Sequence, residues 1–218
     1  ADDDNEEGEE GEGEVEDGEG EEGEGEEPSL KTDKSKKTQI LLHDTHRRLD
    51  EYIMMLKHRK DGKYEDIPHF CIDKLGNIYK IFEPEYSSNT FKIPKIDNGQ
   101  IKIAIENLGW LNKHSVTGIL FNWINSPYRA DPYIKNWRNY SFWDRYTEPQ
   151  MNSLAELCMV LCVEYDINYH CVPSSGYIEN CEKFRGILSK SNFSNIYTDI
   201  NPSFNFNIFE EHVKQAEL

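Results

Sequence analysis

The sequence predicts an α/β fold in which a mixed β-sheet is flanked by helices. Two observations lead to this prediction: short apolar runs typical of buried strands alternate along the chain with longer segments of helical periodicity, and each type occurs more than once. The runs at 39–43 and 101–106 predict strands, and the segments at 45–59 and 147–165 predict helices.

Almost all of the net charge lies in the first 27 residues. The 218 residues include 41 acidic and 24 basic side chains, which gives a formal net charge of −17. Residues 1–27 contain 17 of the acidic residues and no Lys or Arg, so the remainder has 24 residues of each sign. We therefore expect a disordered acidic Glu/Gly-rich tail over 1–27, a linker over 28–38 and one near-neutral domain over 39–218.

The two parts of the chain imply different partners. The tail is either a solvating linker or an arm that binds a basic partner. The near-neutral domain gives no sign of nucleic-acid binding. No apolar run approaches the roughly 18 residues that span a membrane, and no signal-peptide pattern is found.

The first half of the domain contains a predicted helix and hairpin. Leu49, Ile53 and Leu56 share one face of the helix expected at 45–59. Residues 69–73 and 77–82 flank a turn that contains a glycine, which predicts a β-hairpin.

The second half begins with a strand and a long insertion. Residues 101–106 alternate between apolar and polar and predict a strand. Residues 108–146 are rich in Trp, Tyr and Asn with little periodicity, and predict an ordered loop region whose tryptophans line a groove or fill a local core. A capping-box spacing opens the helix at 147–165, an irregular stretch to 196 follows, and 208–214 predicts a last short helix.

The cysteines favour a reduced protein core. The chain has five of them, an odd number, and no C-x-x-C pair. Cys158 and Cys162 fall on one face of the predicted helix. We therefore expect buried thiols instead of a disulfide framework or a Cys-rich zinc site.

His43 is the most informative single residue because it ends the apolar run at 39–43. A strand that delivers a histidine at its carboxyl end is a common way to hold a metal or a catalytic group over a cleft. The alternative is a histidine bonded only to backbone. His46 is a further metal candidate, although we expect it on the surface, in the first turn of the next helix.

Five segments appear in an order that resembles the type-2 N-acetylmuramoyl-L-alanine amidases, whose fold is shared with peptidoglycan recognition proteins. The segments are 40–43, 68–79, 103–107, 146–151 and 198–206, and the resemblance covers about residues 38–212. The segments 108–146 and 186–193 look more like a divergent branch found in large tailed phages.

The resemblance implies a zinc site and a hydrolytic reaction. In the family, two histidines and a third ligand hold zinc, which polarises the lactyl amide carbonyl and activates water. His43 matches the first histidine, Asp199 matches the aspartate ligand, and Glu106 matches the carboxylate that serves as general base. His69 and Asn107 match residues of the substrate pocket.

One departure from the family pattern concerns the second zinc histidine, which should lie between the helix at 147–165 and Asp199. Neither 172–176 nor 186–189 contains a histidine. His170 is the nearest one, several residues out of register, and is the candidate third ligand. One histidine and one aspartate make a poor zinc cage.

Two functions remain open from sequence. The first is a degraded amidase domain of a phage particle, which recognises peptidoglycan or its stem peptide, or has a structural role beside other virion proteins. The second is an active zinc-dependent amidase that cleaves the bond between N-acetylmuramic acid and L-alanine.

Overall fold

The computed structural model describes residues 37–59 and 66–216. The predicted tail and nearly all of the predicted linker lie outside the described residues, so these two parts stay predictions. Within the described ranges, none of the helices has the length and apolar character needed to cross a membrane.

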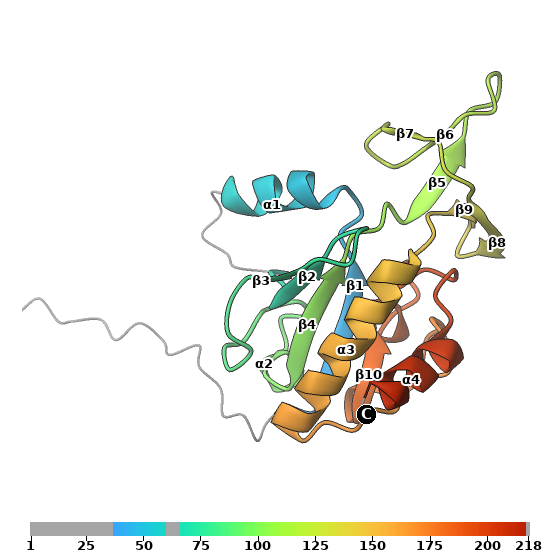
Figure 1. Cartoon of the computed structure of the whole chain (residues 1–218). Coiled ribbons are helices and arrows are strands. Elements are labelled where there is room, and N and C mark those ends of the chain that lie inside the picture. The colour runs from blue at the N-terminus through green and yellow to red at the C-terminus, as the bar shows by residue number, and fades with distance from the viewer. Residues whose placement is uncertain (1–36, 60–65, 217–218) are drawn as a thin grey trace, which may run out of the picture.

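The main sheet has five strands in the order β10-β1-β4-β2-β3 (Figure 1). Their bounds are β1 Gln39–Asp44, β2 Phe70–Ile72, β3 Ile78–Lys80, β4 Gln100–Ile105 and β10 Gly186–Ser189. β1 is parallel to both β10 and β4, and β2 is parallel to β4, whereas β2 and β3 form an antiparallel hairpin. The sheet is therefore mixed, which confirms the predicted fold class.

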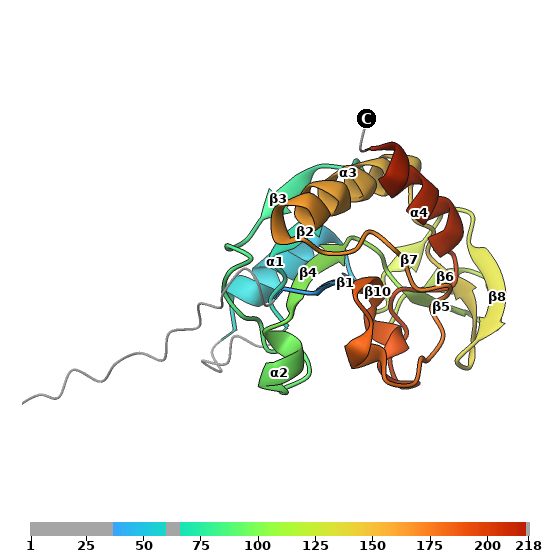
Figure 2. The same cartoon turned by 90° about the horizontal axis from the view of Figure 1, so that it is seen from below.

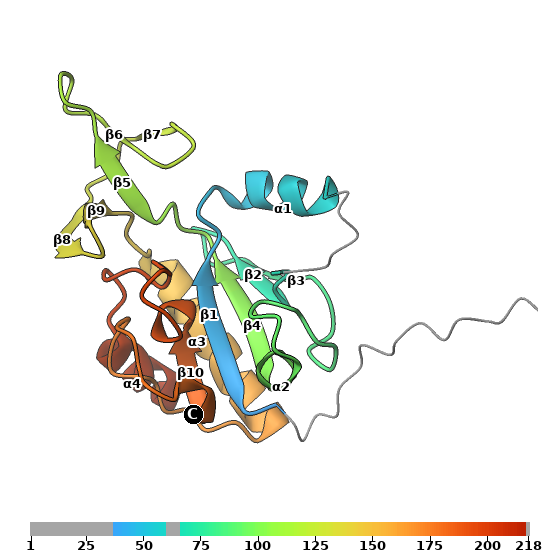
Figure 3. The same cartoon turned by 180° about the vertical axis from the view of Figure 1, so that it is seen from behind.

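Helices cover both faces of this sheet. α3 (Glu148–Tyr165) and α4 (Phe206–Gln215) lie on one face, as Figures 2 and 3 show from two further sides. Ile40, Leu42 and Ile103 are completely buried in the core that these two helices cover. Burying one such side chain contributes about 1.5–3 kcal/mol, so this layer supplies much of the stability.

The start of α3 follows from its sequence. The Gln150 backbone N–H donates to the Thr147 side chain, and the Gln150 side chain accepts from the Thr147 backbone N–H, which completes the predicted capping box. Pro149 sits in the first turn, where a missing N–H costs nothing.

The opposite face of the sheet has α2 (Pro94–Asp97) and α1 (Leu49–Lys57). α1 packs Leu49 and Tyr52 against Cys71 and Ala104, two small side chains of β2 and β4. α1 begins later than predicted because residues 45–48 form a turn, in which His46 has a φ of 55°.

Residues 110–143 form a second, antiparallel sheet of order β7-β6-β5-β9-β8, which projects from the main body (Figure 1). The strands are β5 Trp110–Lys113, β6 Leu120–Phe121, β7 Pro127–Tyr128, β8 Tyr133–Trp137 and β9 Tyr140–Trp143. The expectation of a loop region was wrong here, because strands of two to five residues are too short to show a period. Trp143 is fully buried between Trp137 and Tyr140, so part of the insertion does form a local core.

Strand β10 and the five cysteines can be compared with the expectations from sequence. β10 lies within the stretch that was expected to be irregular, so that expectation was also wrong. All five cysteines are free, and four of them are buried, which agrees with reduced core thiols.

Candidate functional site

A cavity of about 360 Å³ opens at the carboxyl end of β1, on the face of the sheet that carries α1. In open α/β sheets, ligands bind in the crevice outside the carboxyl ends of the strands. The cavity draws on β1 and the turn after it, on α1, on the insertion and on the segment after β10. Its lining residues are His43, Asp44, Thr45, His46, Arg47, Tyr52, Met55, Arg59, Asp66, Trp110, Trp123, Lys190, Thr198 and Asp199.

His43 lines this cavity. It is 5 % exposed, and its register partner in β4 is Ala104, which α1 covers with Leu49 and Tyr52. Burial, together with the charge of Lys190, lowers the pKa of His43 to about 4. The imidazole is therefore neutral at pH 7, the form that can accept a hydrogen bond or ligate a metal.

Asp199 faces His46 across the cavity. One carboxylate oxygen, Oδ1, is 3.6 Å from His46 Nε2, and the other, Oδ2, accepts a 3.3 Å hydrogen bond from the Asp44 backbone N–H. Burial alone would raise the pKa of Asp199, but the contact with His46 and the charges of His46 and Lys190 outweigh it and hold that pKa well below its usual range. Burial would likewise lower the pKa of His46, and Asp199 outweighs it, so the pKa of His46 is raised.

His46 is thus part of the cavity and not an isolated surface residue, because its positive φ turns the chain before α1 begins. Gly109 makes this placement feasible: a Cβ at that position would stand 2.6 Å from His46 Nδ1, and Gly109 itself has a φ of 75°. The His46 carbonyl accepts a 2.7 Å hydrogen bond from the indole N–H of Trp123.

Lys190 brings a positive charge into the cavity. Its Nζ is 3.0 Å from Asp66 Oδ2 and lies 4.9 Å from the centre of the Tyr197 ring. Burial would lower the pKa of Lys190, but the carboxylates of Asp199 and Asp66 outweigh it and raise that pKa.

Asp44 is one of three lining residues, with Arg47 and Asp66, that have a buried polar atom without a hydrogen-bond partner among the described residues. Oδ1 accepts a 2.6 Å hydrogen bond from the Tyr146 hydroxyl, whereas Oδ2 is buried without a partner among the described residues. Burial raises the pKa of Asp44 to about 8. The carboxyl is therefore largely protonated at pH 7 and presents a hydrogen-bonding group that lacks a protein partner.

The insertion contributes two tryptophans to the cavity wall. Trp123 is 44 % exposed, and the Arg47 guanidinium lies 4.9 Å from the centre of its ring. Trp110 stacks on Tyr140 at 4.4 Å, which fixes its orientation from behind.

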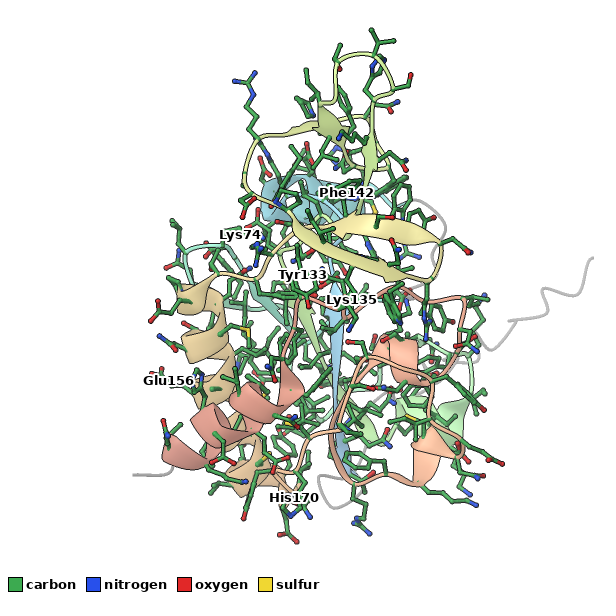
Figure 4. The ribbon with its side chains drawn as sticks, turned by 90° about the vertical axis from the view of Figure 1, so that its right-hand side faces the viewer. Lys74, Tyr133, Lys135, Phe142, Glu156 and His170 are labelled. Carbon is green, nitrogen blue, oxygen red and sulfur yellow. The ribbon has the colours of Figure 1, made fainter. Side chains whose placement is uncertain are left out.

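Of the metal, catalytic and pocket residues selected from sequence, His43, His46 and Asp199 line this cavity. Glu106 lies outside it and accepts a 2.9 Å hydrogen bond from the Lys74 backbone N–H. His170 is on an exposed loop beside Gly186, near the amino end of β10, and Figure 4 shows it at the end of the molecule farthest from the insertion. Its Nδ1 is 3.4 Å from Glu210.

His69 and Asn107 are fully buried structural residues in this fold. His69 Nδ1 accepts from the Lys102 backbone N–H, and its Nε2 is 3.0 Å from the Tyr86 carbonyl. The Asn107 side-chain oxygen, Oδ1, accepts hydrogen bonds from the Gly109 backbone N–H and from the Asn201 side-chain amide. The Asn107 contacts hold the loop after β4, and its backbone N–H also donates to the hydroxyl of Thr45, a residue that lines the cavity. Neither His69 nor Asn107 lines the cavity itself.

Lys190 and Asp66 were not predicted from sequence, whereas Trp110 and Trp123 belong to the segment whose tryptophans were predicted to line a groove or to fill a local core. Lys190 could have been found if the apolar run Ile187-Leu188 after Gly186 had been interpreted as a strand parallel to 39–43. Asp66 and the tryptophans lie in irregular or very short elements, which give no periodic signal.

The donors of the cavity do not form a zinc cage. In the part of the chain that the structure describes, no three His, Cys, Asp or Glu side chains stand close enough together to hold one ion. Zinc requires four ligands in tetrahedral geometry, three of them usually from protein. His43 and Asp199 share the cavity with the Lys190 ammonium, which has no lone pair to offer.

This geometry can be compared with known proteins. The model of the N-acetylmuramoyl-L-alanine amidase family (Amidase_2) matches residues 33–183, more than half of the chain, a segment that contains His43 and stops before Lys190 and Asp199. The α/β fold with a cavity at the carboxyl strand ends defines a class of ligand-binding domain. Within that class, the chain belongs to the N-acetylmuramoyl-L-alanine amidase family.

Solved structures share the fold. The amidase AmiD from E. coli, in complex with the substrate anhydro-N-acetylmuramic acid-L-Ala-D-γ-Glu-L-Lys, superposes with a TM-score of 0.50 at 12 % identity, over 81 % of this chain and 57 % of AmiD. The amidase LysC from Clostridium intestinale superposes with a TM-score of 0.46 at 16 % identity, over 84 % of this chain and 89 % of LysC. The hydrolase AmiA from Staphylococcus aureus superposes with a TM-score of 0.48 at 10 % identity, over 84 % of this chain and 73 % of AmiA. The present chain thus spans little more than half of AmiD, and at these identities the likeness concerns the fold. No curated protein matches by sequence.

Proposed function

We propose that this domain recognises the muramyl-peptide part of peptidoglycan in the His43 cavity and does not use zinc to cleave it. The family membership supports peptidoglycan as the ligand class. AmiD, which has the same fold, binds a muramyl peptide. The observation that carries the proposal is a retained, open cavity whose donor side chains do not form a three-ligand metal site.

The lining of the cavity suits such a ligand. A muramyl peptide combines a sugar, amide groups and carboxylates. The exposed face of Trp123 offers a surface for the sugar, and Arg47 and Lys190 offer cationic groups for a carboxylate. The cavity also contains the neutral imidazole of His43, which offers a hydrogen-bonding group for an amide.

The test is binding of the full chain to purified peptidoglycan and to a soluble muramyl tripeptide, measured with and without a chelator. We expect chelator-insensitive binding, about tenfold weaker in Trp123→Ala because an aromatic contact is lost. Tyr177→Ala removes an exposed aromatic ring outside the cavity and serves as the matched control. Binding that vanishes with chelator, or that Trp123→Ala leaves unchanged, would overturn the proposal.

A second candidate function is hydrolysis by a zinc-dependent amidase. One observation favours it: His43, His46 and Asp199, two imidazoles and a carboxylate, line a single cavity. Metal analysis of the pure protein together with loss of turbidity of cell walls distinguishes the two functions. A stoichiometric zinc ion and wall cleavage would establish the enzyme.

We also propose that the domain belongs to a phage particle. The support is the resemblance of 108–146 and 186–193 to a branch found in large tailed phages. Mass spectrometry of purified particles tests this location, and absence of the chain from them would contradict it.

A further inference from the structure

The residue beside His43, immediately after the end of the adjacent strand β10, is a lysine. β1 and β10 are parallel, and Leu42 pairs with Ser189 at the end of their ladder. The next residue on each side is His43 and Lys190, respectively. Since neighbouring strands lie about 4.8 Å apart, both side chains start from adjacent backbone positions at the mouth of the cavity.

Lys190 extends into the cavity and not into solvent. Its side chain is only 13 % exposed, and it lines the same cavity as His43 and Asp199. The Ser189 backbone N–H and hydroxyl both contact Asn192 Oδ1, which fixes the short helix Lys190–Asn192 from which Lys190 projects.

We propose that the Lys190 ammonium is the permanent positive charge of this cavity and occupies the position that a third metal ligand, beside His43 and Asp199, would need. An ammonium group has no lone pair for a metal, and its charge repels a divalent ion. It compensates carboxylates on two sides of the cavity, through the ion pair with Asp66 and through the charge of Asp199. The cavity therefore keeps a positive centre in the absence of metal.

The inference predicts that one substitution creates a metal site. In Lys190→His, an imidazole replaces the ammonium beside His43, so that His43, Asp199 and the new side chain can converge on one ion. We expect zinc affinity to rise by about 100-fold or more over the wild type, measured by calorimetric titration and native mass spectrometry of the full chain. The double variant Lys190→His/His43→Ala should lose this gain, and Lys183→His, at an exposed lysine outside the cavity, should not show it.

Two results would overturn the inference. One is wild-type protein that binds one zinc ion as tightly as Lys190→His does, with the affinity lost in His43→Ala. The other is a folded Lys190→His variant, verified by circular dichroism, without gain in zinc affinity.

Lys190→Met keeps the inference testable if the histidine variant does not fold. It removes the charge that repels a divalent ion without adding a ligand, so zinc should raise its melting temperature more than that of the wild type and less than that of a variant with a third ligand. An equal response of both proteins would contradict the proposal. These readouts measure metal binding alone, so they can fail or succeed independently of peptidoglycan recognition.

Discussion

The face of the main sheet that carries α1 and α2 contains two groups of ionisable side chains, and one of them lines the cavity described above. The first group, which we call the buried lysine cluster, consists of Lys37, Lys102, Asp97 and His69, and all four are nearly or fully buried. The second is the His43 cavity, which also combines histidine, lysine and aspartate. Residue type alone therefore does not distinguish a functional site from a structural one.

The difference lies in how completely the polar groups are satisfied by the protein. In the buried lysine cluster, Lys102 Nζ donates to Asp97 and to the Ser88 carbonyl, and Asp97 accepts from three backbone N–H groups. In the cavity, Asp44 Oδ2 lacks a partner among the described residues and open volume remains beside His43. A strand-end histidine thus indicates function only where space and unsatisfied groups accompany it.

The largest expected difference is between the stability losses caused by replacing Lys102 of the buried lysine cluster and Lys190 of the cavity. Lys102→Met leaves the Asp97 carboxylate buried without its cation, which should lower the free energy of unfolding by about 3 kcal/mol. Lys190→Met should cost less, about 1 kcal/mol, because Asp66 is 46 % exposed and water can solvate it, and because buried Asp199 keeps His46 as its partner. Urea denaturation measures both. Equal losses would break the distinction between cluster and cavity.

The histidine of the buried lysine cluster should make stability pH-dependent. Burial lowers the pKa of His69 to about 3, against 6.5 for an exposed histidine. Below pH 6.5, His69 becomes protonated in the unfolded chain but stays neutral in the folded chain. The free energy of unfolding should therefore fall by up to about 1.4 kcal/mol per pH unit as the pH decreases toward 3.

His69→Gln should reduce the slope by up to about 1.4 kcal/mol per pH unit, since glutamine does not titrate. The part that remains comes from other groups, His43 among them, whose pKa is lowered to about 4. Urea denaturation at pH 6.5, 5.5 and 4.5 compares the slopes of the two proteins. If the variant keeps the full wild-type slope, His69 is not the group that is buried in its neutral form.

Gly109 tests how His46 is placed at the cavity. Gly109→Ala puts a methyl group 2.6 Å from His46 Nδ1 at a positive φ, and we expect a loss of about 1–2 kcal/mol in stability. Muramyl-peptide binding should weaken as well, because His46 is displaced from Asp199. A stable variant with unchanged binding would show that the position of His46 is irrelevant to the ligand.

The smallest effect is expected at the hydrogen bond from Trp123 to the His46 carbonyl. Trp123→Phe removes this donor and keeps an aromatic face, so the free energy of unfolding should fall by about 1 kcal/mol. Ligand binding should be reduced less than in Trp123→Ala. A thermal denaturation series of the two variants provides the comparison. If both variants bind equally poorly, the indole N–H and not the aromatic face matters for the ligand.

The long apolar elements of the main sheet could be predicted from sequence, and so could α3 and its cap. The signal is a continuous apolar run in β1 and helical periodicity over eighteen residues in α3. The strands of the insertion and β10 have two to five residues, too few for alternation to identify them; β2 and β3 are as short, and the glycine turn between them predicted that hairpin. The same limit applies to the site: His43 is marked by the strand it ends, and Asp199 was assigned by family resemblance.

The remaining cavity residues depend on tertiary structure. Lys190 becomes a neighbour of His43 only through the parallel pairing of β10 with β1. His46 enters the cavity only because Gly109 leaves room for it. Glu106 and His170, selected by family pattern and by proximity in sequence, lie outside the cavity. Their proposed catalytic and ligand roles stay predictions.

The most direct test of metal-free recognition is calorimetric titration of the full chain with a soluble muramyl tripeptide, with and without EDTA, followed by mass spectrometry of the recovered peptide. We predict the same Kd in both conditions, within about twofold, and an intact ligand. Binding that requires zinc, or recovery of a peptide cleaved from its muramyl group, would contradict the account.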